Sequence, residues 1–359
     1  MRIKTNWSFK LPNLKGVSLT AKVLFARHLS IMLRSGTTLS EALEIASEAS
    51  EAGFGRIIAD IGNSVRTGRT LSESFAGYPA VFSEFFVSGT AAGEKSGTLE
   101  ENLESIADQL ERDKELQDKI KGAMTYPIIV LTACFGLGIV MSYVVLPKIM
   151  TIFEGVSDLP APTRMLVAFT NFIQHHGIVF IVALAAGIFG TTWILRRKFV
   201  RPLTHWFILY IPIINTISRK SNLTRFCGSL GMLLKSGLLI EEALAVTKST
   251  MSNYYFRKAV NEAASRIGKG TKLADNLTQY KSLFPIIVIK MVHIGEESGT
   301  LEENLLYLAG FYQKEVDVLT KSLSTVIEPL LLLFVGGIVA FFALAVMTPL
   351  YNLSSAVAQ

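Results

Sequence analysis

The chain repeats one stretch of eleven residues. Residues 93–103 read GEKSGTLEENL and residues 295–305 read GEESGTLEENL, so ten of eleven positions agree. Each copy leads into a long amphipathic segment, then a proline, then an apolar stretch long enough to enter a bilayer, at a constant offset of 202 (295 − 93). The repeated unit is therefore a soluble module together with its membrane helix.

The first half of the motif predicts a turn between two helices. Gly93 and Gly295 follow apolar segments and can adopt the left-handed conformation that ends a helix. Gly97 and Gly299 would then relieve the backbone just before the next helix starts.

The second half predicts the start of that next helix. Thr98 followed by Glu101, and Thr300 followed by Glu303, have the spacing of a capping box, which stabilises a helix start by about 1 kcal/mol. The acids also suit the positive end of the helix dipole. Turn chemistry thus explains the glycines, the threonines and the later glutamates of the motif.

Composition indicates a folded chain with room for two or three domains, because half of the 359 residues are hydrophobic and only 18% are charged. The two cysteines, Cys134 and Cys227, fall in different segments and give neither a disulfide framework nor metal-binding spacing. The net charge of +6 is concentrated in residues 196–328. We attribute it to the cytoplasmic face of a membrane protein and not to nucleic-acid binding.

The sequence predicts an all-α protein with two homologous cytoplasmic six-helix bundles and three transmembrane helices. Helical periodicity runs through the first bundle, and residues 25–36 recur as residues 226–237. Residues 1–19 lack the pattern of a signal peptide and are expected to stay cytoplasmic. The predicted order is: segment 1–19, bundle 20–127, span 128–146, loop 147–177, span 178–195, bundle 196–328, span 329–349 and tail 350–359.

The length of the apolar stretches predicts the spans, and the position of basic residues predicts their orientation in the membrane. Residues 128–146 are nineteen positions without a charged side chain. A helix of this length comes close to the thickness of the hydrocarbon layer, which is roughly 30 Å. Pro127 and Pro329 lie where the first and third spans begin. Basic residues cluster just after the second span, at Arg196, Arg197, Lys198 and Arg201. Both bundles are therefore expected in the cytoplasm, and the loop 147–177 and the tail 350–359 are expected on the other side of the membrane.

No catalytic, cofactor or metal site is expected. The nearest match to a phosphate-binding loop, residues 267–272, has Gly270 where a hydroxyl must follow the lysine. The predicted spans hold no Asp, Glu, Lys, Arg or His, which argues against a transporter. A transporter and a membrane-anchored sensor of unknown ligand remain the alternatives to a structural or assembly role.

The motifs together resemble the inner-membrane platform proteins of type IV pilus and type II secretion machines. They comprise the duplicated GExSGxL motif, AMxYP at residues 123–127, LPxPTR at 159–164 and the pair Glu328-Pro329, in that family's order. The resemblance implies an inner-membrane protein with a cytoplasmic N-terminus and a periplasmic C-terminus. It implies self-association and a cytoplasmic hexameric ATPase that acts on the soluble modules. It also implies contact with lipid, other assembly proteins, and the pilin or pseudopilin subunits that enter a filament.

Glu94 and Glu296 are not needed for the predicted turn. Both modules keep this acid although the next residue, Lys95 or Glu297, differs in charge. The carboxylate is therefore expected to have a partner within the bundle, on a neighbouring subunit or on the ATPase. An exposed ion pair contributes only about 0 to 1 kcal/mol, so alanine at these positions is expected to spare folding and reduce filament assembly.

Overall fold

The computed structural model describes residues 16–145 and 212–357, and between them residues 161, 163–166, 168, 172, 175, 186–187 and 190. The chain is helical across these residues, with turns but no strand among them, which confirms the all-α prediction. The predicted second span at 178–195 lies almost wholly outside the described residues, as do most of the segment 1–19 and of the loop 147–177.

The chain divides into two compact units. The first comprises residues 1–117 and 205–317, and the second comprises residues 118–204 and 318–359. Both helical bundles belong to the first unit, and the long apolar helices continue into the second.

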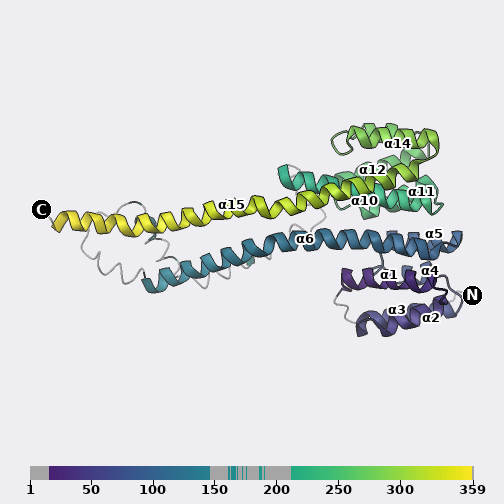
Figure 1. Ribbon diagram of the computed structural model, residues 1–359, viewed down its shortest axis with the longest axis horizontal. Helices are drawn as coiled ribbons and strands as arrows, with labels where there is room; N and C mark the ends of the chain where they lie inside the picture. Colours follow the sequence, from purple (N-terminus) through teal and green to yellow (C-terminus); the bar gives the residue numbers. More distant parts are fainter. Residues whose placement is uncertain are drawn as a thin grey trace, which may run out of the picture. The chain divides into compact units, whose positions relative to one another are not determined.

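The first bundle is built from six helices in chain order (Figure 1). Serine or threonine hydroxyls accept the hydrogen bonds that cap the starts of four of them, at Ser18, Thr38, Thr70 and Ser83. The helices are α1 (Leu19–Arg34), α2 (Leu39–Glu48), α3 (Ala52–Arg66), α4 (Leu71–Ala76), α5 (Glu84–Ser96) and the first part of α6 (Leu99–Val140).

The second bundle repeats this order, as the sequence predicted. Its helices are α10 (Pro212–Lys235), α11 (Ile240–Thr250), α12 (Tyr254–Ile267), α13 (Leu273–Thr278), α14 (Ile286–Ser298) and the first part of α15 (Leu301–Val357). The starts of α2 and α11 differ by an offset of 201 (240 − 39), and those of α3 and α12 by an offset of 202 (254 − 52). The one-residue insertion therefore falls around the connection between α11 and α12.

Phenylalanine rings fill both bundle cores at equivalent positions. In the first bundle, Phe25 packs edge-on against Phe54 with ring centroids 5.6 Å apart. In the second bundle, Phe226 and Phe256 each pack edge-on against Phe284, at 5.1 and 5.3 Å. Each buried ring contributes about 1.5 to 3 kcal/mol through the removal of apolar surface from water. The repeat of the sequence is thus a repeat of the core.

Two helices of the described part are long and apolar enough to cross a membrane. They are Leu99–Val140 and Leu301–Thr348, and each continues from a bundle without a break (Figure 1). Pro127 and Pro329 lie inside α6 and α15 and not at a helix start. A proline removes one backbone hydrogen bond from a helix interior but does not end these helices. The soluble helix that follows the repeated turn is therefore the same helix that becomes apolar.

Within the second unit, the LPxPTR segment is tied to α15. Thr163 Oγ1 donates a hydrogen bond to the carbonyl oxygen of Ala345 at 2.7 Å, and Leu166 packs against the same residue. Both side chains are buried. The segment predicted as an external loop thus contributes a helical contact to the third predicted span.

Candidate functional site: the repeated turn and the adjoining cleft

Gly97 and Gly299 end the helices before the turn. Their φ angles are 74° and 73°, in the left-handed region that favours glycine, and they form the C-caps of α5 and α14. The next residue donates its N–H to the carbonyl of Gly93 or Gly295, at 3.0 Å in both copies. The sequence predicts the left-handed role for Gly93 and Gly295, and this prediction is wrong because each helix runs one turn further.

Gly93 and Gly295 instead allow two helices to approach closely. Both are buried within α5 and α14. A Cβ atom on Gly93 would lie 2.9 Å from the Cα atom of Leu99, and one on Gly295 would lie 2.7 Å from the Cα atom of Leu301. Backbone atoms cannot move aside as a flexible side chain can. These glycines therefore set the spacing between the two arms of each helical hairpin.

The carboxylate of Glu94 caps a third helix. Its Oε1 atom accepts the N–H of Leu71 at 2.5 Å, and its Oε2 atom accepts the N–H and the hydroxyl of Ser72 at 3.1 and 2.5 Å. These N–H groups belong to the first turn of α4, where no carbonyl within the helix can accept them. A negative charge also suits the positive end of a helix.

Glu296 makes the equivalent contacts in the second bundle. It accepts the N–H of Leu273 at 2.5 Å and the N–H of Ala274 at 2.9 Å, at the start of α13. The residue before α13, Lys272, offers no side-chain cap, whereas Thr70 also caps α4. Both acids therefore have a partner inside their own bundle, and at α13 the N-cap side chain does not share this role.

The predicted capping box is not formed as expected. The hydroxyls of Thr98 and Thr300 lie 2.7 Å from the hydroxyls of Ser96 and Ser298. In the described part of the chain no hydrogen bond joins Thr98 to the N–H of Glu101, or Thr300 to that of Glu303. The threonine hydroxyls instead close the turn across the left-handed glycine.

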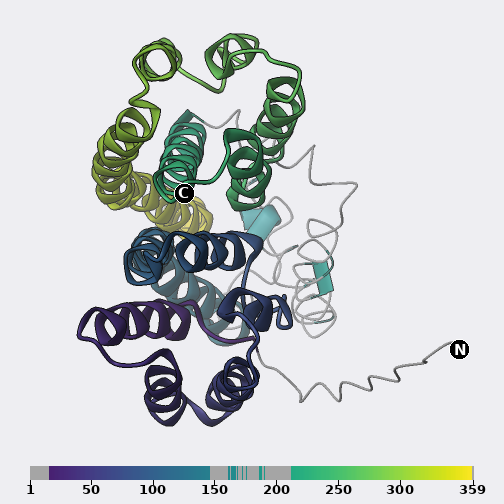
Figure 2. The same ribbon diagram turned by 90° about the vertical axis from the view of Figure 1, so that its right-hand side faces the viewer.

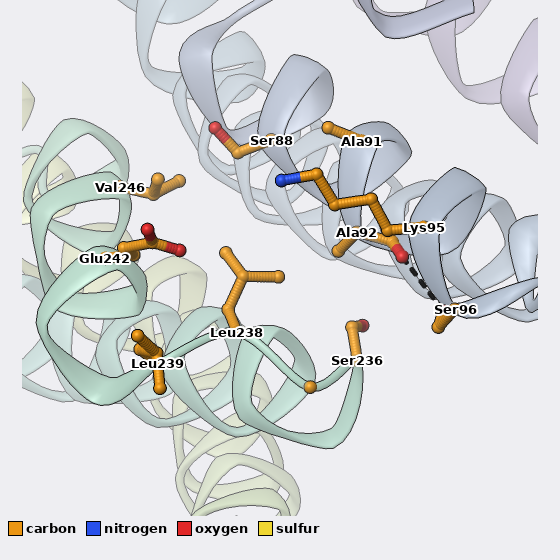
Figure 3. A pocket seen from close by; sticks show the side chains of 11 residues that line it. Ser88, Ala91, Ala92, Lys95, Ser96, Ser236, Leu238, Leu239, Glu242 and Val246 are labelled. Carbon is orange, nitrogen blue, oxygen red and sulfur yellow. Dashed lines mark hydrogen bonds between the residues drawn. The ribbon is translucent and has the colours of Figure 1, made fainter.

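The one motif position that differs between the copies has two different surroundings. Glu297 accepts a hydrogen bond from Lys272 Nζ at 3.1 Å, which lowers the pKa of its carboxyl together with the nearby His293. Lys95 points into a cleft between α5 and the α10–α11 hairpin (Figure 3). The substitution therefore changes the surface beside the turn and leaves the turn itself unchanged.

That cleft marks the contact between the two bundles, where α5 lies against α10 and α11 (Figure 2). A Cβ atom on Gly89 would lie 2.8 Å from Cε of Met232, so this glycine admits the methionine. Asn102 accepts a hydrogen bond from the Ser236 hydroxyl. Asp113 accepts one from Arg225 at 2.7 Å. Sequence reasoning missed these residues, although Asn102 belongs to the repeated motif.

The cleft has a volume of about 470 Å³ and a mixed lining. Alanine, serine and leucine side chains form most of it, and Lys95 and Glu242 approach from opposite walls (Figure 3). The lining holds no histidine, cysteine or aspartate, and no cluster of possible metal ligands occurs among the described residues. Its lining therefore consists mainly of small and aliphatic side chains, with one acid and one base.

The other predicted site residues lie along the long helices and not at the turn. Pro127 is buried in α6, whereas Glu328 and Pro329 are exposed on α15. All three belong to the second unit, in the region that each helix enters after leaving its bundle. The structure therefore places one set of predicted residues at the turn and another set on the long apolar helices.

Comparison with known proteins gives the family. A model of protein F of the type II secretion system matches residues 25–147 and again residues 226–349. The two matches begin at an offset of 201 (226 − 25) and end at an offset of 202 (349 − 147), which are the offsets of the internal repeat. The chain belongs to the type II secretion protein F family. The resemblance read from the motifs is thereby confirmed.

The chain is similar both to type IV pilus assembly proteins and to type II secretion system proteins. The chain is 32% identical to the type IV pilus assembly protein PilC of Myxococcus xanthus, over 97% of this chain and 84% of that protein. It is 32% identical to the type II secretion system protein F of Aeromonas hydrophila, over 96% and 89%. It is 33% identical to PilC of Thermus thermophilus, over 94% and 84%. These similarities and the two apolar helices support an inner-membrane role in pilus assembly or secretion.

Proposed function

We propose that this chain is the inner-membrane platform that couples a cytoplasmic assembly ATPase to the insertion of pilin or pseudopilin subunits into a filament. The supporting observation is the continuity of α6 and α15, each of which runs from a bundle into an apolar segment. A continuous helix transmits displacement along its axis better than two helices joined by a loop. A force applied to the bundles would therefore reach the membrane segment.

The proposed partners follow from this role. The ATPase acts on the two bundles, filament subunits contact the membrane helices, and other inner-membrane assembly proteins and further copies of the chain surround them. The chain supplies no nucleotide site, enzyme chemistry or nucleic-acid contact in this proposal. The ATPase applies force to the bundles, and the bundles pass it to the long helices.

The bundles are expected to be necessary for ATPase capture. The chain, solubilised from membranes with a tag, is expected to co-purify the assembly ATPase. A version without both bundles is expected to lose it. A version without residues 350–359 is the matched control, because it shortens the chain at the far end of α15. Retention of the ATPase by the bundle-free version would contradict the proposed coupling.

The proposed topology places both bundles in the cytoplasm, with residues 147–177 and the C-terminal tail in the periplasm, and includes three spans. Its basis is the basic cluster at residues 196–201. In a chain with Cys134 and Cys227 replaced by alanine, a cysteine introduced at Ser157 should react with an impermeant maleimide added to whole spheroplasts. A cysteine at Ser249 should react only after lysis. The reverse pattern would exclude this orientation.

A further inference from the structure

The contact between the two bundles exists once in the chain, although the parts that form it exist twice. It joins α5 and α6 of the first bundle to α10 and α11 of the second. The counterparts of α5 and α6 are α14 and α15, and the counterparts of α10 and α11 are α1 and α2. A second contact of the same design would join α14 and α15 to α1 and α2. Among the described helices, α14 makes no substantial contact with α1 or α2.

The first half of this second contact is exposed and apolar. Ala92 and Gln109, at the formed contact, are only 4% exposed. Their counterparts in the second bundle are Ile294 and Phe311, which are 53% and 45% exposed. We define the α14 face by four exposed side chains of α14 and α15: Ile287, Ile294, Tyr307 and Phe311.

The other half is exposed in the same way. Met232 and Val246, on the α10–α11 side of the formed contact, are 5% and 8% exposed. Their counterparts in the first bundle are Ile31 and Ile45, which are 54% and 46% exposed. Leu24, the counterpart of Arg225, is exposed on the same side of α1. We define the α1 face as Leu24, Ile31 and Ile45.

We infer that the α14 face of one copy packs on the α1 face of a second copy, and so repeats between chains the contact that α5 makes with α10 and α11 within one chain. Four of these side chains lie at positions that are buried in the formed contact, and such side chains are costly to leave in water. They are Ile294 and Phe311 on the α14 face, and Ile31 and Ile45 on the α1 face. The formed contact shows which surface covers them. The inference rests on the self-association included in the proposed function and specifies its surfaces.

Such a contact is head-to-tail, because the two faces differ. Repetition of a head-to-tail contact gives a ring when the rotation closes and an open array when it does not. One pair of charged residues differs between the formed contact and the inferred one. Lys95 and Glu242 line the formed cleft, whereas their counterparts Glu297 and Glu41 are both acidic. Because Lys272 already pairs with Glu297, the repulsion is reduced.

Cysteine cross-linking in membranes tests the direction of the contact. The close pair Gly89 and Met232 corresponds to Met291 in one copy and Ile31 in the other. Two differently tagged chains, I31C and M291C, both with Cys134 and Cys227 replaced by alanine, are co-expressed and oxidised with copper phenanthroline. A disulfide-linked dimer carrying both tags is expected from the mixture, and little dimer from either variant alone. The double variant G89C/M232C is the intrachain reference, because it places cysteines at the same two positions of the formed contact.

Two results would overturn the inference. One is a dimer formed by I31C alone, because it indicates a two-fold contact of the α1 face with itself. The other is the absence of dimer in the mixture while the disulfide of the intrachain reference closes and the chain still self-associates.

A second variant separates this contact from ATPase binding. I31K/I45K should weaken self-association by about tenfold or more, because it places unpaired charges in an apolar contact. I31V/I45V should leave self-association nearly unchanged, and the ATPase should co-purify with both. Loss of the ATPase from I31K/I45K with unchanged oligomer size would assign the α1 face to the ATPase and overturn the inference. If the wild-type chain itself did not co-purify the ATPase, only the proposed function would be contradicted.

Discussion

Alanine at Gly93 or Gly295 is expected to destabilise its bundle by about 3 kcal/mol, because overpacking of a tight contact costs this much when the neighbour cannot yield. The neighbour is backbone in both copies, at Leu99 Cα and Leu301 Cα. The two arms of the hairpin would have to move apart, and the α4 or α13 cap held by the adjacent acid would be displaced with them. Thermal unfolding of the detergent-purified chain and its level in membranes measure the loss.

A matched substitution separates this effect from the general cost of changing a helical glycine. Gly310 lies in α15, in the same repeat as Gly295, and a Cβ atom there would meet nothing within 4 Å. Gly310→Ala should be neutral or stabilising by up to about 1 kcal/mol, because alanine favours the helix. If Gly295→Ala unfolded at the same temperature as Gly310→Ala, the close-approach role would be excluded.

The second large effect is expected at the motif's first acid. Glu94→Gln and Glu296→Gln keep the size of the side chain but remove the charge that strengthens two hydrogen bonds to backbone N–H groups. Bonds to a charged group contribute about 1.5 to 3 kcal/mol each in net stability, so a loss of about 2 kcal/mol is expected at either site. Glu296→Gln should cost more than Glu94→Gln, because Thr70 continues to cap α4 whereas α13 has no such side chain.

The control lies in the same motif. Glu303 is exposed and makes no hydrogen bond or ion pair in the described part of the chain. Glu303→Gln should change the unfolding temperature little. Equal stability of Glu296→Gln and Glu303→Gln would contradict the capping role of the first acid.

The expected loss of stability differs from the expectation drawn from the sequence, in which substitution of Glu94 or Glu296 spares folding. That expectation assumed an exposed ion pair with another side chain. The partners are instead backbone N–H groups 22 to 23 residues earlier in the chain, together with the Ser72 hydroxyl at Glu94. Backbone groups are present at every position, so no residue pattern marks the ones that an acid will reach.

Local features were predictable because they depend on near neighbours. The helices of both bundles, and their correspondence, follow from apolar periodicity and from the repeat. The roles of the glycines were exchanged because the sequence does not fix the residue at which a helix ends, and one further turn moves the left-handed position from Gly93 to Gly97. The prolines were placed at boundaries, but Pro127 and Pro329 lie inside helices that continue through them. Contacts between the bundles depend on tertiary packing and could not be predicted.

The repeated acid, Glu94 or Glu296, acts inside its own bundle as a helix cap. Amide hydrogen exchange measures this directly at Leu71 and Ser72, and at Leu273 and Ala274. These amides should be protected in the wild-type chain. Glu94→Gln should speed exchange at the first pair, and Glu296→Gln at the second, by about tenfold or more, as a loss of about 2 kcal/mol implies. Unchanged exchange at both pairs, with ATPase capture lost, would show that the acid serves a partner and would contradict its role as a cap within the bundle.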